Sequence, residues 1–164
     1  MYHIYMVTRE TKMLILMESS MYYRSLIIEE NQETDNSSKY SHFKPEQIID
    51  YNCKRYGSTL NGRKEVVKEI LHSSSKIPIP IIPHLGIYIF PTASNKNKNC
   101  VWLAYHHIKD YKEHNDKTMV SFFDGTGMEI NSSTSVFDRQ YKRASQVIVH
   151  FNRSLLFGKG PKLW

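Results

Sequence analysis

The residues of this chain whose types suit chemistry are two adjacent histidines and, close behind them, three carboxylates. His106 and His107 lie in a predicted strand, so their rings point to opposite faces and cannot hold one metal ion together. Asp110, Glu113 and Asp116 are interleaved with lysines, which is typical of a solvated connection. A metal-dependent nuclease needs converging carboxylates around Mg²⁺. The sequence therefore favours neither a metal site nor a nuclease centre.

The two cysteines make no better case for an enzyme. Cys53 falls on the apolar side of a predicted helix and is interpreted as a small buried residue, whereas the role of Cys100, at a strand start, stays open. A thiol–imidazole pair would need a group that orients the histidine, and the sequence offers none. CxxC pairs and the GxSxG, HExxH and GxxxxGK[ST] motifs do not occur in the sequence. We expect no catalytic residue, no metal and no cofactor.

Positive charge is concentrated in one part of the chain. The 164 residues include 22 Lys and Arg against 16 Asp and Glu, a net charge of +6. Residues 1–43 hold four basic and six acidic residues, whereas residues 44–164 hold 18 and 10, so the local charges are −2 and +8. Proteins that meet a polyanion concentrate charge in this way. The candidate DNA contacts are Lys54, Arg55, Arg63, Lys64, Lys68, Lys96, Lys98, Lys109, Lys112, Arg139, Lys142 and Arg143.

Length and composition indicate one folded domain, residues 1–164. Apolar residues make up 40% of the chain, which is enough for a core. No basic segment precedes an apolar one as in a secretory signal, and three prolines interrupt the apolar run Ile77–Pro83. We therefore expect a cytoplasmic, nucleoid-associated protein that has no membrane partner.

The elements that must position these residues begin with short strands in residues 1–30. The alternation of Ile, Tyr and Met predicts strands at Tyr2–Thr8 and Met13–Glu18, joined by a turn, and a third strand within Met21–Glu29. Residues 31–43 are predicted to be a flexible loop, because their first nine positions carry no apolar residue. The strands of residues 1–30 would pack on the rest of the domain.

Residues 45–72 predict two helices joined by a short link. Pro45 suits a first helical turn and Gly57 ends that helix, while Asn61 is predicted to cap a second helix that runs to about His72. The expected buried positions are Ile48, Ile49, Asn52, Cys53, Tyr56, Val66, Val67, Ile70 and Leu71. Helix-turn-helix DNA readers use such an αα-hairpin, and so do many proteins that never touch DNA. The hairpin alone therefore leaves the function open.

The second half of the chain predicts strands and one long helix. The strands are Pro80–Ile82, Leu85–Phe90, Val101–His106, Thr118–Phe123 and Met128–Ile130, the last two joined by the turn Asp124-Gly-Thr-Gly127; Ala93–Asn99 is a basic loop. A helix from Val136 to about Leu155 is predicted to have Ser135 as its cap and Asp138 at its third position. Its expected core face is Phe137, Tyr141, Ala144, Ile148, Phe151 and Leu155, and residues 156–164 form an irregular tail. The fold class is α+β, with antiparallel strands and helices packed on one side.

Four stretches resemble one known family in order and spacing. They are IIDYNCKRYGSTLNGRK, PIIPHLGIYIFPT, NCVWLAYHHIKDYK and VFDRQYKRA, within residues 44–155. With the triplets Gly62-Arg63-Lys64 and Phe90-Pro91-Thr92 and the pair Cys100-x-Trp102, they resemble the ComK competence transcription factors. The resemblance implies a bacterial transcription activator of competence genes that binds A·T-rich promoter boxes through the minor groove, with more than one protomer on the DNA.

Of the basic residues that lie within the matching motifs, four are the favoured DNA contacts. They are Arg63, Lys64, Lys109 and Lys112. Of these, Arg63 is the expected groove reader, because an arginine is less strongly hydrated than a lysine and enters a narrow groove at lower cost. The other cations would neutralise phosphates without reading the base sequence.

The chain end departs from what the resemblance implies. Family members continue into a polar tail that a MecA-type adaptor recognises and delivers to a ClpC-type protease, and the ending up to Trp164 does not resemble that tail. A naturally short branch and an interrupted reading frame both stay open. A second functional reading is a protein-interaction factor on the same scaffold that does not bind DNA; a nuclease is the third. Salt-sensitive attraction to duplex DNA distinguishes the first reading from the second.

Overall fold

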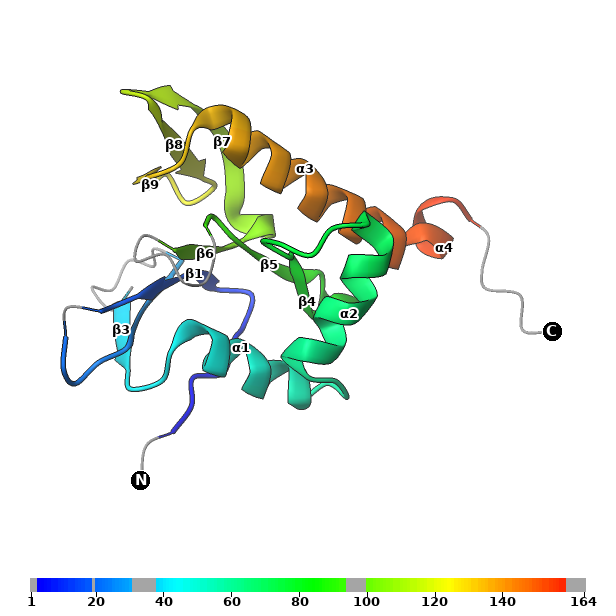
Figure 1. The fold of residues 1–164 in the computed structure, drawn as a ribbon, viewed down its shortest axis with the longest axis horizontal. Helices are drawn as coiled ribbons and strands as arrows, with labels where there is room; N and C mark the ends of the chain where they lie inside the picture. Colours follow the sequence, from blue (N-terminus) through cyan, green and yellow to red (C-terminus); the bar gives the residue numbers. More distant parts are fainter. Residues whose placement is uncertain (1–2, 19, 31–37, 94–99, 159–164) are drawn as a thin grey trace.

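The computed structural model, which describes residues 3–18, 20–30, 38–93 and 100–158, consists of two antiparallel sheets and four α-helices (Figure 1). The six-stranded sheet has the order β3-β2-β1-β6-β5-β4, and the three-stranded sheet has the order β7-β8-β9. The predicted α+β class is confirmed. The elements are β1 (Thr11–Leu16), β2 (Ser25–Glu29), β3 (Ser38–Ser41), α1 (Pro45–Lys54), α2 (Leu60–Leu71), β4 (Ile79–Ile82), η1 (Pro83–Leu85), β5 (Ile87–Pro91), β6 (Val101–Ala104), η2 (Tyr105–His107), β7 (Ile108–His114), β8 (Lys117–Phe122), β9 (Gly127–Ile130), α3 (Thr134–Phe151) and α4 (Arg153–Leu156).

The pairing of β1 with β6 joins the two halves of the larger sheet. Met13 lies opposite Leu103 and Leu14 opposite Trp102. Successive residues of these strands face opposite sides of the sheet, so each strand contributes to two cores. Leu14 and Trp102 belong to the core under α1 and α2, whereas Met13 and Leu103 face the core between the larger sheet, the smaller sheet and α3.

The second core positions α3 against both sheets. Phe137 of α3 is buried and packs edge-on against Phe90 of β5, with ring centroids 5.9 Å apart. On the smaller sheet, the buried Val120 and Phe122 alternate with outward-facing residues, because successive strand residues point to opposite faces. The helix therefore has a defined position between α2 and the smaller sheet (Figure 1).

Several predicted elements differ from the observed ones. Residues 3–8 form no strand: the side chain of Asn52 in α1 accepts a hydrogen bond from the backbone N–H of Val7 (2.9 Å) and donates one to the carbonyl of Tyr5 (2.9 Å), so this segment bonds to a helix. The strand β3 lies in the predicted loop 31–43, of which residues 31–37 are outside the described chain. The segment 108–114, predicted to be a solvated connection, is the strand β7.

The helix ends and faces also need correction. Thr59 and Ser133 are the N-caps of α2 and α3, each two residues before the predicted cap. The long helix ends at Phe151 and α4 follows, so Leu155 is 81% exposed instead of buried. Gln140 and Val147 take core positions that were not predicted, while Val66 of α2 is 47% exposed. The apolar face of α1 is confirmed: Ile48, Ile49, Asn52 and Cys53 are buried and Tyr56 packs against the same core.

The predicted basic loop lies almost entirely outside the described chain, as do residues 159–164 of the predicted tail. Within the described ranges, no helix is both long and apolar enough to cross a bilayer.

Candidate nucleic-acid interface

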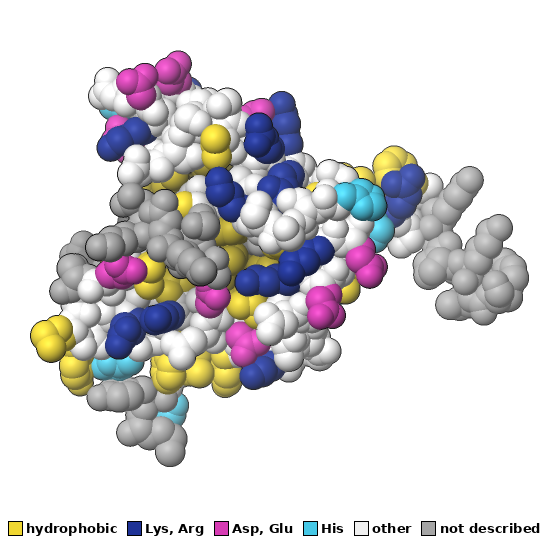
Figure 2. Space-filling view, in the orientation of Figure 1, with side chains coloured by type: hydrophobic (Ala, Val, Ile, Leu, Met, Phe, Trp, Pro, Cys, Tyr) yellow, Lys and Arg dark blue, Asp and Glu magenta, His cyan; other side chains and the backbone are white. Residues whose placement is uncertain are grey.

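The helix α3 brings basic residues of three elements into one region. It contacts α2 on one side and β7 and β8 on the other (Figure 1). On the face drawn in Figure 2, Lys and Arg side chains gather over α2 and α3. We use the name basic band for the following residues of the three elements: Lys64, Lys68, Lys109, Lys112, Arg139, Lys142 and Arg143.

Arg143 ties α3 to the segment that follows α2. Its guanidinium donates hydrogen bonds to the side chains of Gln140 (2.8 Å) and Ser73 (2.7 Å) and to the carbonyl of Ser75 (2.9 Å). Its half-buried position lowers the pKa of the guanidinium, and the charge of Arg139 adds to this. Arg143 therefore holds the band in shape, whereas Arg139 is exposed and free of any hydrogen bond to the described residues.

Lys142 and β7 form the other end of the band. Lys142 is 73% exposed and pairs with Asp138 at 2.8 Å, and Asp138 also accepts the hydroxyl of Tyr111 at 2.6 Å. These two hydrogen bonds, chiefly the one from Lys142, lower the pKa of Asp138. Tyr111 packs against Tyr141 with tilted rings whose centroids are 5.1 Å apart, which fixes β7 beside α3.

The favoured residues of β7 are exposed but have acidic neighbours. Lys109 and Lys112 project from the strand, and so do Asp110 and Glu113. Alternating charges weaken the local positive potential, so this strand contributes less attraction for a polyanion than the helices do. The four favoured contacts thus come from two elements, α2 and β7, that both contact α3.

Arg63 has a different environment from the other favoured residues. Its side chain is half-buried in the α1–α2 hairpin, where one terminal nitrogen donates to the carbonyl of Tyr56 (3.3 Å) and the buried Nε has no hydrogen-bond partner among the described residues. It lies close enough to Cys53 to lower the pKa of that thiol, but burial has the larger effect and raises it to about 11. A groove reader has to extend from the surface, and Arg63 does so less than Arg139.

Two of the remaining candidates, Lys54 and Arg55, lie at the end of α1. Lys54 pairs with Asp50 at 3.0 Å, and the guanidinium of Arg55 lies 5.6 Å from the ring of Tyr56, both at the C-terminal end of α1. Lys96 and Lys98 lie outside the described chain.

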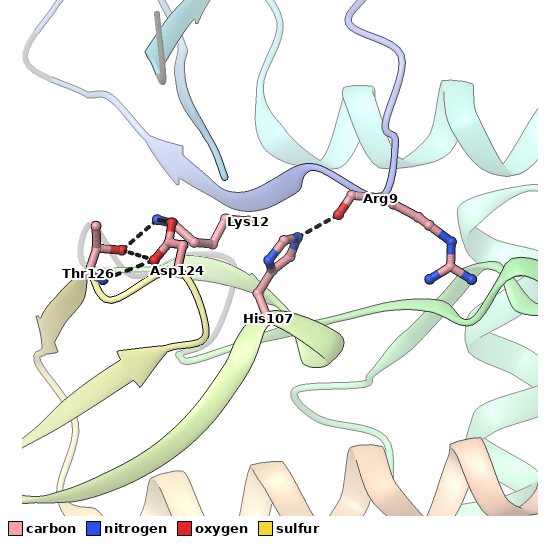
Figure 3. A network of polar contacts seen from close by, with 5 residues as sticks. All are labelled: Arg9, Lys12, His107, Asp124 and Thr126. Atoms are coloured by element: carbon pink, nitrogen blue, oxygen red, sulfur yellow. Dashed lines mark hydrogen bonds and ion pairs between the residues drawn. The ribbon is translucent and has the colours of Figure 1, made fainter. Parts of the chain in front are cut away.

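The two histidines do not behave as residues of a strand. His106 and His107 lie in η2, where the ring centroids are 4.3 Å apart and both Nε2 atoms approach the carbonyl oxygen of Arg9, at 2.8 and 2.5 Å. Figure 3 shows the contact between His107 and Arg9. The prediction that they point to opposite faces is wrong, because the tight turn of η2 replaces the strand after Ala104. Burial, with a smaller contribution from His107, lowers the pKa of His106. Within the described ranges, no group of three His, Cys, Asp or Glu side chains is placed to hold a metal.

A buried ion pair beside these histidines was missed in the sequence. Lys12 of β1 donates to Asp124 (2.8 Å) and Thr126 (2.7 Å) in the β8–β9 turn, and both charged side chains are 3% exposed (Figure 3). Lys12 looks like a turn residue because it follows Arg9 and Glu10 in a polar stretch. Only the distant partner explains its burial. The ion pair of Lys12 and Asp124, together with the contacts of η2, holds the smaller sheet against the larger one.

Comparisons with known proteins identify the family. Residues 2–155 match the family model described as ComK protein. The chain belongs to the ComK family. A competence transcription factor of Bacillus subtilis (strain 168) is 35% identical to this ComK-family chain over 113 residues, which cover 68% of the chain and 59% of that protein. The chain thus spans about three-fifths of the length of the curated relative that it matches. No solved structure matches it.

The family assignment covers the elements of the basic band. The matched residues of this ComK-family chain include all of α2, β7 and α3. They also include residues 2–43, for which the sequence motifs carried little resemblance. The strands β1, β2 and β3 therefore belong to the family fold, since β1 is paired with β6 in the middle of the larger sheet.

Proposed function

We propose that this chain is a DNA-binding transcription activator of competence genes that places the basic band against duplex DNA. The observation that carries the proposal is the position of α3, which brings the half-buried Lys64 and the exposed Lys68 of α2, its own cations and those of β7 into one region. The 35% identical relative, a competence transcription factor, supports the same function.

The band would act mainly by neutralising phosphates. Exposed lysines such as Lys68 and Lys142 replace condensed counterions along the backbone, which gives affinity without base reading. For A·T-rich boxes, whose narrow minor groove attracts arginine, the reader would be Arg139, because it is the exposed arginine of the band. The half-buried Arg63 would stabilise the α1–α2 hairpin. More than one protomer would occupy a box.

The test is a titration of an A·T-box duplex and a scrambled duplex across a salt series. Lys142→Ala should reduce the slope of log K against log salt by about one unit on both duplexes. Its matched control is Lys39→Ala, because Lys39 is also an exposed lysine with one carboxylate partner, Glu29 at 2.9 Å, but lies on β3. The Lys39 variant should retain the wild-type slope.

Base reading is tested separately with Arg139. Arg139→Ala should cost roughly 1–3 kcal/mol of binding on the A·T duplex and less on the scrambled one. Arg24→Ala, which removes an exposed arginine near the β1–β2 turn, is the control and should bind as the wild type does.

The outcome also distinguishes the other readings. Equal affinity and slope in the Lys142 and Arg139 variants would remove the band from the DNA contact. Failure of the wild type to bind either duplex at low salt would favour a protein-interaction factor on this scaffold. Strand cleavage that depends on added Mg²⁺ would favour a nuclease.

A further inference from the structure

An open cavity lies between the larger sheet and the start of α1. Its volume of about 580 Å³ equals that of about 19 water molecules at roughly 30 Å³ each. The lining comes from the end of β1, from the segment between β1 and β2, from the first turn of α1 and from β6. In Figure 1, α1 lies beneath β1, which it contacts. Ligand sites commonly have volumes of about 300–1,000 Å³, so the cavity is large enough for a small molecule.

Four charged side chains line this cavity, two of each sign. They are Arg24, Lys44, Glu18 and Glu46. Within the part of the chain that the structure describes, none of the four forms an ion pair. Among the described residues, none that lines the cavity belongs to the basic band. The four charges are therefore available to a ligand that carries the opposite charges.

The first turn of α1 holds two of these charges in place. The side-chain oxygen of Gln47 accepts a hydrogen bond from the backbone N–H of Lys44 at 2.8 Å, which fixes the start of the helix. Burial raises the pKa of the Cys100 thiol, and the charge of Glu46 adds to this effect, so that carboxylate lies near β6. Charged groups held in this way lose little conformational entropy when a ligand binds to them.

Apolar side chains form another part of the lining. Leu16 and Met17 are half-buried at the end of β1, and the buried Trp102 belongs to β6. In ligand sites, apolar surface contacts the body of the ligand, and a few polar groups fix its orientation. The cavity therefore suits a molecule with an apolar body.

The signs of the four charges restrict the ligand further. The carboxylates of Glu18 and Glu46 would repel a phosphate or another simple anion. The cationic groups of Arg24 and Lys44 would repel a metal ion or an amine in the same way. A molecule with one ammonium group and one carboxylate group satisfies both pairs.

We propose that this cavity binds a zwitterionic ligand with an apolar body, of the chemical class of a short peptide with free ends. Arg24 and Lys44 bind its carboxylate group, and Glu18 and Glu46 bind its ammonium group, through charge-assisted hydrogen bonds. The inference does not rest on the proposed function, because the ligand binds to the free protein without DNA.

Calorimetric titration of the full chain with the dipeptide leucyl-leucine tests the site. The dissociation constant should lie between about 10 µM and 1 mM, the range that ligands of this size commonly reach. Two blocked forms of the dipeptide each lack one charge, the C-terminal amide and the N-acetyl form. Each should bind about tenfold or more weakly than the free dipeptide, since two charged groups of the protein lose their partner.

A double variant tests the carboxylate end of the ligand. Arg24→Gln/Lys44→Gln should bind leucyl-leucine and its amide with equal affinity, because the groups that distinguish them have been removed. The matched control is Lys54→Gln/Arg55→Gln, which removes the same two charges from the other end of α1. The control should retain the preference of the wild type for the free carboxylate.

A second double variant tests the ammonium end. Glu18→Gln/Glu46→Gln should bind leucyl-leucine and its N-acetyl form with equal affinity. Its control is Glu65→Gln/Glu69→Gln, which removes two exposed carboxylates of α2 and should retain the wild-type preference. Circular dichroism and thermal melting establish that each variant keeps the fold.

Three results would overturn the proposal. The first is the absence of binding by the wild type at dipeptide concentrations up to about 10 mM. The second is equal affinity of the wild type for the free and the blocked dipeptides, and the third is an unchanged preference in both cavity variants. A chain that fails to bind the dipeptide but binds the A·T duplex in a salt-dependent way would overturn only this inference and leave the DNA-binding proposal in place.

Discussion

The buried pair of Lys12 and Asp124 is the contact between the two sheets whose removal has the most definite expected cost. The charged groups are 2.8 Å apart, both side chains are 3% exposed, and Thr126 bonds to both of them. We expect Lys12→Met to destabilise the fold by about 3–5 kcal/mol, because it removes the ammonium group that contacts a buried carboxylate. Asp124→Asn should destabilise the fold by a similar amount, since it leaves the ammonium group of Lys12 buried without the carboxylate of Asp124.

The destabilisation of each single variant comes from the charged side chain that stays buried after the other has been replaced. In the double variant Lys12→Met/Asp124→Asn neither charge is buried, so the destabilisation should be much smaller than the sum of the two single effects. Urea unfolding followed by the fluorescence of the buried Trp102 gives the three free energies of unfolding. With an m-value of about 2 kcal/mol/M, each single variant should lower the midpoint by roughly 1.5–2.5 M.

Two results would refute this reasoning. Single-variant costs below about 1 kcal/mol would mean that the pair behaves as an exposed ion pair does. Additive costs in the double variant would mean that the two groups contribute independently, in conflict with their 2.8 Å separation. The Lys39 and Glu29 pair on the surface is the internal control, and Lys39→Met should change stability by no more than about 1 kcal/mol.

Two further predictions concern single side chains. Cys53→Ala should cost on the order of 1 kcal/mol of stability and leave DNA affinity unchanged, and the buried wild-type thiols, with the pKa of Cys53 raised to about 11, should react with a thiol reagent only on unfolding; rapid labelling of the native protein would contradict this. For His106, burial lowers the folded-state pKa below the unfolded value of about 6.5, so the unfolded chain binds more protons and stability falls as the pH is lowered through that value. The melting temperature of His106→Gln should depend less on pH between about pH 7.5 and 5.5 than that of the wild type, and an unchanged dependence would contradict the assignment.

Local signals in the sequence were sufficient for the elements whose ends they mark. Pro45 and the left-handed Gly57 (φ 84°) bound the first helix and its turn, and the Asp-Gly-Thr-Gly turn marks the β8–β9 hairpin. The strand β7 was missed because only its inner face is covered, so charged residues occupy most of its positions. The segment at residues 3–8 has a strand-like pattern, but the amide of Asn52 takes its backbone bonds.

In the candidate site, too, some features follow from the local sequence, and others depend on contacts between residues that are distant in the chain. Composition and charge were enough to assign the positive charge to residues 44–164, and α2 and α3 carry several of these cations. The inward position of Arg63 depends on how α1 packs on α2, and the bonds of Arg143 depend on Ser73 and Ser75. Neither can be read from the spacing of residues within one helix. DNA contact by any of these side chains stays a prediction.

The pairing of β1 with β6 has a consequence for how the chain folds as it is synthesised. The strand β1 can pair with β6 only after Leu103, the partner of Met13, has been synthesised. By the time β6 leaves the ribosome, α1 and α2 have already left it. Until then the early strands expose an unpaired edge and the apolar residues Leu14 and Ile27. Contacts so distant in sequence slow folding. A nascent chain that stalled before β6 would therefore be a better substrate for chaperones and proteases than the completed protein.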